Sequence, residues 1–191
     1  MSIKTYLRRG ISYVLHGQPV ENHCVTAQIV HLAPNELLKG RTAMVTGGTS
    51  GIGRAIATAF IRAGANDVII TGRDLQRVNN VCDEIEKTTN SRAIHGIEMD
   101  ICDVKSMEEK WKDALQYSRT NRIDIVVNNA GVLGTSFGRT TEEDYEMVMQ
   151  TNLRGTYFLS QIAAHYMKDN GIQGNILNVA SSSSLRVSSQ F

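Results

Sequence analysis

Thr46-Gly47-Gly48-Thr49-Ser50-Gly51-Ile52-Gly53 is the stretch from which we predict the fold of this chain. It follows the apolar run Ala43-Met44-Val45 and precedes a helix-like run from Ala55 to Ala65, so it predicts a tight turn between a strand and a helix. Glycines let the backbone approach a pyrophosphate, and the N–H groups and positive dipole end of the next helix face the anion. Six residues of the turn are predicted to bind phosphate: Gly47, Thr49, Ser50, Gly51, Ile52 and Gly53.

Apolar runs and helix-like segments alternate along the rest of the chain. We predict strands at 42–46, 67–71, 93–99, 122–127 and 175–180, and helices at 52–63, 75–85, 106–115 and 141–168. Ser106 and Glu109 have the spacing of a capping box at the start of the third helix. The alternation predicts an α/β domain with a doubly wound parallel sheet, helices on both faces and a ligand at the carboxyl ends of the strands.

The composition excludes several classes of protein. With 191 residues and 41% hydrophobic content, one substantial core is expected, and 20 basic residues against 19 acidic ones do not suggest a nucleic-acid partner. No stretch approaches the ~20 apolar residues of a membrane span. Cys24, Cys82 and Cys102 form no CxxC pair, so we predict buried thiols and a reducing compartment, the cytoplasm.

Residues 1–40 carry none of the motifs used here, and we divide the chain into an N-terminal extension, 1–40, and a nucleotide-binding domain, 41–191. Arg8 and Arg9 precede a short apolar run that resembles a secretory leader, but the run is too short and no cleavage pattern follows it. No metal site is predicted, because three histidines of this segment lie seven and eight residues apart, which fits no common ligand spacing: His16, His23 and His31.

Further motifs follow the glycine turn in a fixed order. Asn128-Asn129-Ala130-Gly131 follows an apolar run, Asn152-Leu153-Arg154-Gly155 lies in a long helix-like segment, and a predicted strand ends near Ser181. Together these motifs resemble the short-chain dehydrogenase/reductase family, in its shorter single-domain branch, over about Leu38 to Ser184. The resemblance implies a Rossmann-type fold and an NAD(P)-dependent oxidoreductase that transfers hydride between nicotinamide and a carbonyl or alcohol substrate of the 3-oxoacyl or ketone type.

The junction Gly72-Arg73-Asp74 bears on the choice of cofactor. In dinucleotide folds an acidic residue about 20 positions beyond the glycine motif holds the ribose 2′-hydroxyl, whereas a nearby Arg accommodates a 2′-phosphate. Here Gly72 removes a carboxylate and leaves room, and Arg73 supplies a forked cation. We predict NADP rather than NAD. The alternative is that Arg73 caps a surface turn while Asp74 faces the ribose.

The resemblance also implies roles for residues after the third and fourth predicted strands. Asp100 would contact the adenine amino group and Ile101 would lie against the ring, although a turn or cap role for Asp100 stays open. Asn128 would tie strands together. The ribose would be lined by the next three residues: Asn129, Ala130 and Gly131.

Two catalytic residues follow from the same resemblance. Ser181 would hydrogen-bond the substrate oxygen, and Asn152 would hold a water in a proton relay, while a tyrosine with a lysine four positions later acts as the general acid. Asn152 is expected inside a helix, where Asn has no intrinsic advantage. A hydrogen bond from the helix to a loop is the alternative explanation of that residue.

The Tyr-x-x-x-Lys motif itself is missing. All six tyrosines precede Ser181, and none has a lysine four positions later. We therefore expect a truncated member of the family, lacking the closing C-terminal strands and inactive in isolation, whose full-length form is a homo-oligomer with helix 141–168 between subunits. The alternative is a catalytically silent dinucleotide-binding or interaction module. The substrate and the reaction direction cannot be read from the sequence.

A serine hydrolase is a further alternative, because Gly134-Thr135-Ser136-Phe137-Gly138 matches the GxSxG string. A nucleophile elbow requires a strand immediately before the serine and a helix immediately after it, and here a turn is expected before it. The downstream His165 and Asp144 would lie about 30 Å apart on one helix, at ~1.5 Å per residue, so they cannot pair. We do not favour this alternative.

Overall fold

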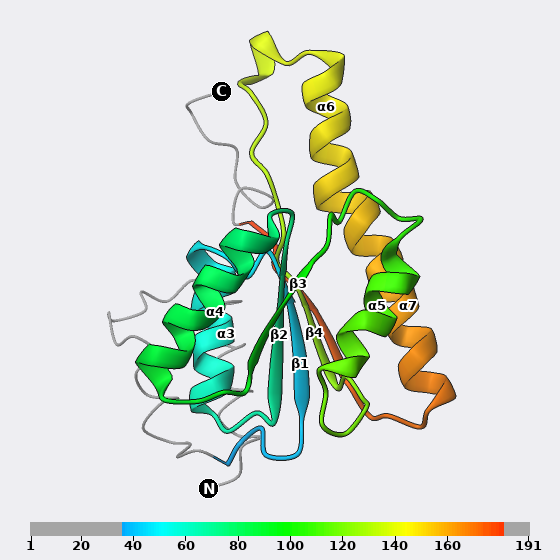
Figure 1. Ribbon diagram of the computed structural model, residues 1–191. Helices are drawn as coiled ribbons and strands as arrows, with labels where there is room; N and C mark the ends of the chain where they lie inside the picture. The colour runs from blue at the N-terminus through cyan, green and yellow to red at the C-terminus, as the bar shows by residue number, and fades with distance from the viewer. Residues whose placement is uncertain (1–35, 182–191) are drawn as a thin grey trace, which may run out of the picture. The chain divides into compact units, whose positions relative to one another are not determined.

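Five parallel strands form one sheet in the order β3-β2-β1-β4-β5 in the computed structural model, which describes residues 36–181 (Figure 1). The chain winds outward from β1 to β3 and then returns to the other side of β1 for β4 and β5. The predicted doubly wound α/β fold is therefore confirmed. The strands are β1 (Thr42–Thr46), β2 (Asp67–Gly72), β3 (Ile94–Glu98), β4 (Ile125–Asn128) and β5 (Asn175–Asn178).

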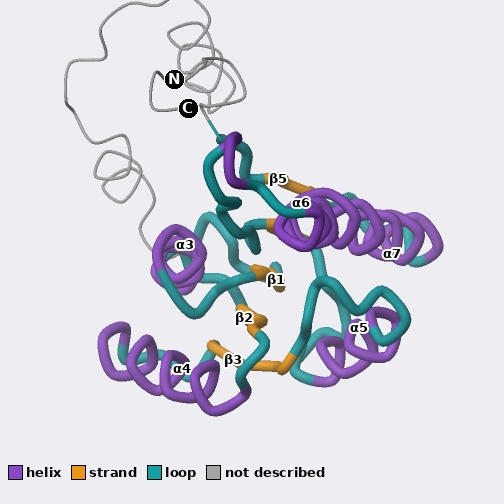
Figure 2. The backbone as a smooth tube through the Cα atoms, turned by 90° about the horizontal axis from the view of Figure 1, so that it is seen from above, coloured by secondary structure: helices purple, strands orange, loops and turns teal. Residues whose placement is uncertain are grey.

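Helices cover both faces of the sheet, as Figure 2 shows from the strand ends. Helices α3 (Gly51–Arg62) and α4 (Leu75–Thr89) pack on one face, and α5 (Met107–Gln116) and α7 (Thr156–Asp169) pack on the other. Alternate residues of a strand point to opposite faces. Ala43 and Val45 accordingly join the core under α3 and α4, while Met44 joins the core under α5 and α7. Burial on both faces explains the continuous apolar runs of the central strands.

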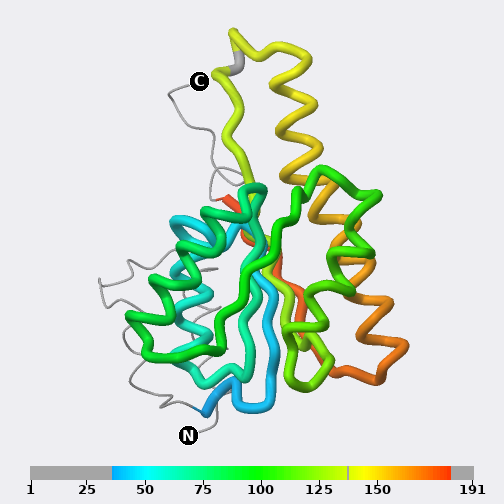
Figure 3. Tube along the Cα trace, in the orientation of Figure 1, coloured from blue at the N-terminus to red at the C-terminus, as the bar shows by residue number. Residues whose placement is uncertain are grey.

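The loop after β4 leads to the short 3-10 turn η1 (Phe137–Arg139) and to α6 (Glu142–Met149), which project beyond the carboxyl ends of the strands (Figure 3). The predicted helix 141–168 is not one regular α-helix. A single π-helical segment, η2 (Gln150–Gly155), joins α6 to α7. Asn152 therefore lies in a π turn, which was not predicted.

Helix capping differs from the prediction at one place. Ser106 precedes α5 with α-helical backbone angles (φ −85°, ψ −11°) and makes no side-chain cap hydrogen bond. Its hydroxyl donates instead to the Asp103 carbonyl, so the predicted capping box is wrong. Thr141 and Asp144 form a capping box at the start of α6, because the Thr141 hydroxyl accepts from the Asp144 N–H and the Asp144 carboxylate accepts from the Thr141 N–H.

Strand β5 is the outer strand of the described sheet beside β4. The side-chain amide of Asn128 donates a hydrogen bond of 2.8 Å to the side-chain oxygen Oδ1 of Asn178, so Asn128 ties β4 to β5. Leu177 of β5 is 47% exposed, and no further strand within residues 36–181 pairs with the outer edge of β5.

Residues 1–35 of the predicted N-terminal extension, with Cys24 and the three predicted non-ligand histidines, lie outside the described residues, and the boundary of the extension stays a prediction. Leu38, just before β1, packs against the core and donates its N–H to the Ala63 carbonyl. Over residues 36–181, no helix has both the length and the apolar character needed to cross a membrane, and no cluster of three or more metal-ligating side chains occurs.

Two fully buried carboxylates stand at the amino ends of the strands, opposite the predicted ligand end. Asp124 accepts hydrogen bonds from the Thr42 N–H at 2.9 Å, from Arg41 at 3.0 Å and from Arg122 at 2.6 Å. Asp67, at the start of β2, accepts from the N–H and Nε of Arg119 at 2.9 and 3.0 Å. Burying a carboxylate requires such partners. The two clusters hold the starts of β1, β2 and β4 together.

We predict that Asp124→Ala lowers the free energy of unfolding by about 3 kcal/mol, because the Thr42 N–H loses its partner and two guanidinium groups lose theirs. Urea denaturation followed by circular dichroism measures this loss. The control is Asp113→Ala, which removes only the exposed pair with Lys110 at 3.8 Å and should cost less than about 1 kcal/mol. Equal losses in the two variants would contradict the role given to Asp124.

Candidate functional site

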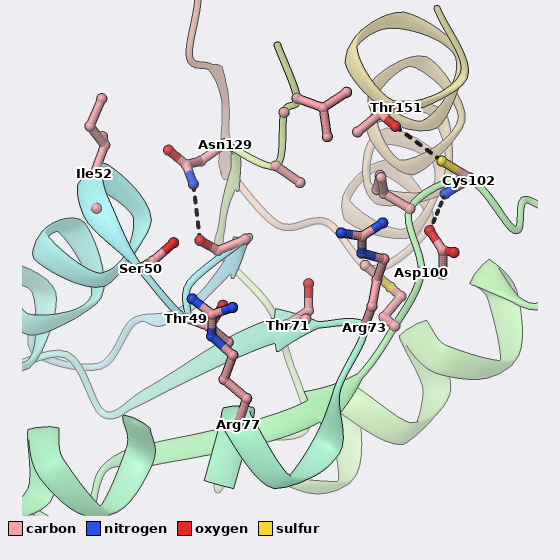
Figure 4. A pocket seen from close by; sticks show the side chains of 18 residues that line it. Thr49, Ser50, Ile52, Thr71, Arg73, Arg77, Asp100, Cys102, Asn129 and Thr151 are labelled. Carbon is pink, nitrogen blue, oxygen red and sulfur yellow. Dashed lines mark hydrogen bonds between the residues drawn. The ribbon is translucent and has the colours of Figure 1, made fainter. Parts of the chain in front are cut away.

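A cavity of about 500 Å³ opens at the carboxyl ends of the strands (Figure 4). Its walls are the glycine turn after β1, the end of β2 at Thr71–Arg73, the segment Met99–Cys102 after β3 and the segment Asn129–Val132 after β4. Arg77 of α4 and Thr151 of η2 complete it. Because the sheet reverses its strand order between β1 and β4, this is the place where doubly wound folds bind ligands.

The glycine turn needs its glycines for two reasons. Gly47 and Gly51 have positive φ angles of 63° and 49°, which side chains rarely adopt. No atom lies within 4 Å of the position that a Gly51 Cβ would take, so this glycine leaves open space at the cavity wall. A Cβ on Gly53 would instead overlap the Asn129 amide and the Gly47 carbonyl. Five of the six predicted turn residues line the cavity, and Gly53 lies behind them.

Helix α3 begins at the cavity without a side-chain cap. Its N-cap residue, Ser50, makes no cap hydrogen bond, and no acidic residue occupies the first turn. The first N–H groups of a helix have no partner within the helix and attract anions. This helix end, together with the space beside Gly51, fits the diphosphate of a dinucleotide.

The segment after β4 is joined tightly to the glycine turn. The Thr46 hydroxyl accepts from the N–H groups of Asn129 and Ala130, each at 3.0 Å. The Asn129 amide donates back to the carbonyls of Thr46 at 2.9 Å and Gly47 at 3.3 Å. Asn129, Ala130 and Gly131 all line the cavity. The side-chain N–H groups of Asn129 are used to fix the shape of the cavity wall.

Two guanidinium groups line the cavity, one from Arg73 just after β2 and one from Arg77 in the first turn of α4. Arg73 and Arg77 both line it, and within the described residues neither is ion-paired with a carboxylate, whereas Arg54 contacts Glu84 at 2.7 Å. Asp74 is not among the lining residues, and its carboxylate accepts from the Arg77 N–H at 3.0 Å as the N-cap of α4. The alternative in which Asp74 faces the ribose is therefore not supported.

Gly72 lines the cavity and also packs closely on its other side. A Cβ at this position would lie 2.9 Å from methyl carbons of Thr49 and Val78. Close packing of the glycine turn against α4 therefore requires the absence of a side chain here. That this glycine leaves room for a ligand stays a prediction.

The segment after β3 holds Asp100 and Ile101, as predicted for the same wall. The Asp100 carboxylate accepts from the Cys102 N–H at 2.9 Å, which is the turn role left open for it. Ile101 is 6% exposed and packs in the core under α5 and α7. Both residues line the cavity, so a contact with an adenine ring is compatible with their positions.

The two predicted catalytic residues are not among the cavity-lining residues. Both polar atoms of the Asn152 side chain bond to one loop residue. Its Oδ1 accepts from the Val132 N–H at 2.8 Å, and its Nδ2 donates to the Val132 carbonyl at 2.9 Å. This is the helix-to-loop hydrogen bond given as the alternative. Ser181 is exposed and lies three residues beyond the end of β5.

The GxSxG string does not form a nucleophile elbow. Ser136 follows the loop after β4 and immediately precedes the 3-10 turn η1, so no strand leads into it. Asp144 is occupied by the Thr135 hydroxyl at 2.9 Å and by its capping box with Thr141.

The two described cysteines are half-buried, not fully buried as predicted. Burial, and to a smaller extent the carboxylates of Asp83 and Glu86, raises the pKa of the Cys82 thiol to about 12. Cys102 lines the cavity and contacts the hydroxyl of Thr151 at 3.2 Å. Neither Thr151, Cys102 nor Arg77 was predicted, because only the tertiary fold brings them to the glycine turn.

Comparisons with known proteins agree with this geometry. The family model described as short chain dehydrogenase matches residues 41–191. The chain is 37% identical over 145 residues to the 3-oxoacyl-(acyl-carrier-protein) reductase of Aquifex aeolicus, covering 75% of this chain and 56% of that protein. It is 32% identical over 146 residues to glucose 1-dehydrogenase 2 of Bacillus subtilis, covering 75% and 55%.

Among solved structures, the 3-ketoacyl-(acyl-carrier-protein) reductase from Brucella melitensis complexed with NADH superposes with a TM-score of 0.69 at 30% identity. The match covers 77% of this chain and 60% of that one. The chain thus spans little more than half the length of these two curated relatives.

We predict that Gly53→Ala destabilises the domain by about 1–3 kcal/mol, since the added methyl group overlaps the Asn129 amide and forces the glycine turn apart. Thermal and urea unfolding measure the change. Gly138→Ala is the matched control, because no atom lies within 4 Å of its Cβ position, and it should change stability by less than about 0.5 kcal/mol. A neutral Gly53→Ala variant would show that the turn is looser than described.

Proposed function

This chain belongs to the short-chain dehydrogenase/reductase family, and on that premise we propose that it forms the NADP(H)-binding part of an oxidoreductase acting on a carbonyl or alcohol substrate. Members of this family bind nicotinamide dinucleotides. The observation that carries the proposal is the cavity at the β1/β4 reversal, with an uncapped helix end on one side and, on another, two guanidinium groups that pair with no carboxylate of residues 36–181.

The N-terminus of α3 would hold the diphosphate through the backbone N–H groups of Ser50, Gly51 and Ile52. When bound, the cofactor supplies hydride chemistry, and the protein supplies position, orientation and proton handling. Asp100 and Ile101 would hold the adenine, while Asn129, Ala130 and Gly131 would line the ribose. The positions of these residues on the cavity wall support the assignments.

NADP is proposed over NAD because of the charge at the end of β2. A phosphate monoester carries close to two negative charges at pH 7 and is bound well by forked, permanently charged guanidinium groups. Arg73 and Arg77 offer two such groups, and the only carboxylate between them in sequence, that of Asp74, caps α4. Arg77 therefore joins Arg73 as a residue proposed to choose the cofactor.

Catalytic roles rest on Ser181 for the substrate oxygen and on Asn152 for the proton relay. The bonds from Asn152 to Val132 support a positioning role for this side chain. The 191 residues contain no tyrosine with a lysine four positions later. A dinucleotide-binding or interaction module without turnover is therefore the second candidate function. Relatives with different substrates match equally broadly, so a 3-oxoacyl or ketone substrate is a proposal.

Association with a second copy is proposed for the face formed by α6, η2 and α7. Large apolar side chains lie exposed along it: Tyr145, Met147, Leu153 and Tyr157, at 54%, 44%, 57% and 61%. We propose that residues 1–40 form an extension to the nucleotide-binding domain 41–191. We also propose a cytoplasmic location, because the three cysteines form no CxxC pair.

We predict that the chain binds NADPH more tightly than NADH and that Arg73→Ala or Arg77→Ala each weakens NADPH binding about tenfold, with NADH changed less than about threefold. Isothermal titration calorimetry with both cofactors measures this. Arg92→Ala is the control, since Arg92 pairs with Glu86 at the other end of α4. Equal affinities for the two cofactors, unchanged by either substitution, would exclude the NADP preference.

We also predict negligible carbonyl-dependent oxidation of NADPH by the purified 191-residue chain, although it binds the cofactor. The general acid of the family motif typically contributes ~10²- to 10⁴-fold to the rate, and no residue of this chain matches it. Absorbance at the reduced-nicotinamide band, followed with a panel of ketones and 3-oxoacyl thioesters, tests the point. Robust turnover would refute it and would identify another proton donor.

A further inference from the structure

The π-helical segment η2 contacts two walls of the cavity that follow strands not paired with each other. The segment Met99–Cys102 follows β3 and the segment Asn129–Val132 follows β4, and β2 and β1 lie between these two strands. No direct β-ladder therefore joins the two strands that carry these segments. Single π turns often occur at functional sites, because the added residue changes which side chains face each side of a helix.

One side of η2 holds the segment after β3. The Thr151 hydroxyl contacts the Cys102 thiol at 3.2 Å, and the Arg154 guanidinium donates to the Cys102 carbonyl at 3.3 Å (Figure 4 shows the first contact). Gly155 packs so closely on Ile101 that a Cβ there would overlap the Ile101 carbonyl oxygen. Residues three and four apart share a helix side, so Thr151, Arg154 and Gly155 act on this segment together.

The neighbouring residue of η2 holds the segment after β4. Asn152 makes both of its side-chain hydrogen bonds to the backbone of Val132. Its Oδ1 also lies 3.4 Å from the position of a Gly131 Cβ. Consecutive residues of one turn, Thr151 and Asn152, therefore fix opposite walls.

We propose that η2 is a clamp that sets the separation of these two walls, and that Thr151 is the positioning residue through which the clamp places Asp100, Ile101 and Cys102 for the adenosine half of the ligand. The inference rests on the proposed dinucleotide site. Thr151 is 7% exposed, and within the described part of the chain its hydroxyl has one hydrogen-bonding side-chain partner, the Cys102 thiol. The backbone N–H of Cys102 in turn donates to the Asp100 carboxylate. Loss of the Thr151 hydroxyl would release Cys102 toward the cavity.

The test separates the two halves of the ligand. Thr151→Val keeps the shape of the side chain and removes its hydroxyl, while Thr151→Ser keeps the hydroxyl. We measure binding of 2′,5′-ADP and of nicotinamide mononucleotide to the full chain by NMR titration, together with the unfolding temperature without ligand. Thr89→Val is the control, because the Thr89 hydroxyl bonds only within α4, to the Ile85 carbonyl at 2.7 Å.

The expected result for Thr151→Val is an affinity for 2′,5′-ADP about fivefold weaker, as the loss of one hydrogen bond allows, with binding of the mononucleotide unchanged within about twofold. Thr151→Ser should restore the affinity, and Thr89→Val should leave it unchanged. In the unmodified chain, 2′,5′-ADP should also shift the amide resonance of Val132, and Thr151→Val should reduce that shift, since the clamp links the two walls.

Several outcomes would overturn the inference. Unchanged 2′,5′-ADP affinity in Thr151→Val, equal weakening of both ligands, or failure of Thr151→Ser to restore binding would each show that Thr151 is only a packing residue. If Thr151→Val does not fold, Cys102→Ala and Cys102→Ser give the same comparison from the other partner. Failure of the unmodified chain to bind 2′,5′-ADP would refute the proposed NADP(H) site on which the inference rests, whereas binding that does not depend on the Thr151 hydroxyl would refute the clamp alone.

Discussion

The hydrogen-bonded joint between the glycine turn and Asn129 is the constraint on which the rest of this structure depends. Thr46 accepts two backbone N–H groups from the segment after β4, and Asn129 donates two hydrogen bonds back to the turn. The joint lies where the strand order reverses, and it holds the turn after β1 against the segment after β4. A side chain at Gly53 would break this joint, which explains why the first turn of α3 has a glycine at this position.

The charges of the domain are arranged along the strands to match that joint. At the amino ends, Asp67 and Asp124 are fully buried and satisfied by arginines, which closes that end of the sheet. At the carboxyl ends the arginines Arg73 and Arg77 have no carboxylate partner within the described residues, and a helix end lacks its cap. Two guanidinium groups without a carboxylate partner among the described residues therefore line the cavity, whereas the buried carboxylates lie at the opposite ends of the strands. That asymmetry, more than the glycines alone, is what suits the cavity to an anionic ligand.

The sequence predicted those features that depend on neighbouring residues. Strand β1 has the predicted bounds, because all five of its residues are buried and its three central residues are apolar. Features that depend on contacts across the fold were missed. Ser106 has the sequence spacing of a capping box but α-helical backbone angles. The π-helical segment η2 has no hydrophobic pattern that distinguishes it from the α-helices on either side. Arg77 reaches the cavity only because α4 begins beside it. The pairing of Thr151 with Cys102, 49 residues apart, leaves no local signal.

We propose above all that a nicotinamide dinucleotide binds at the carboxyl ends of the strands, with its diphosphate on the N-terminus of α3. A crystal structure of the chain grown with NADPH tests this placement. We expect density for the diphosphate against the N–H groups of Ser50 to Ile52, with the adenosine between Arg73 and Ile101. A dinucleotide bound elsewhere, or a diphosphate placed away from α3 in a well-ordered crystal, would show that the proposed site is wrong.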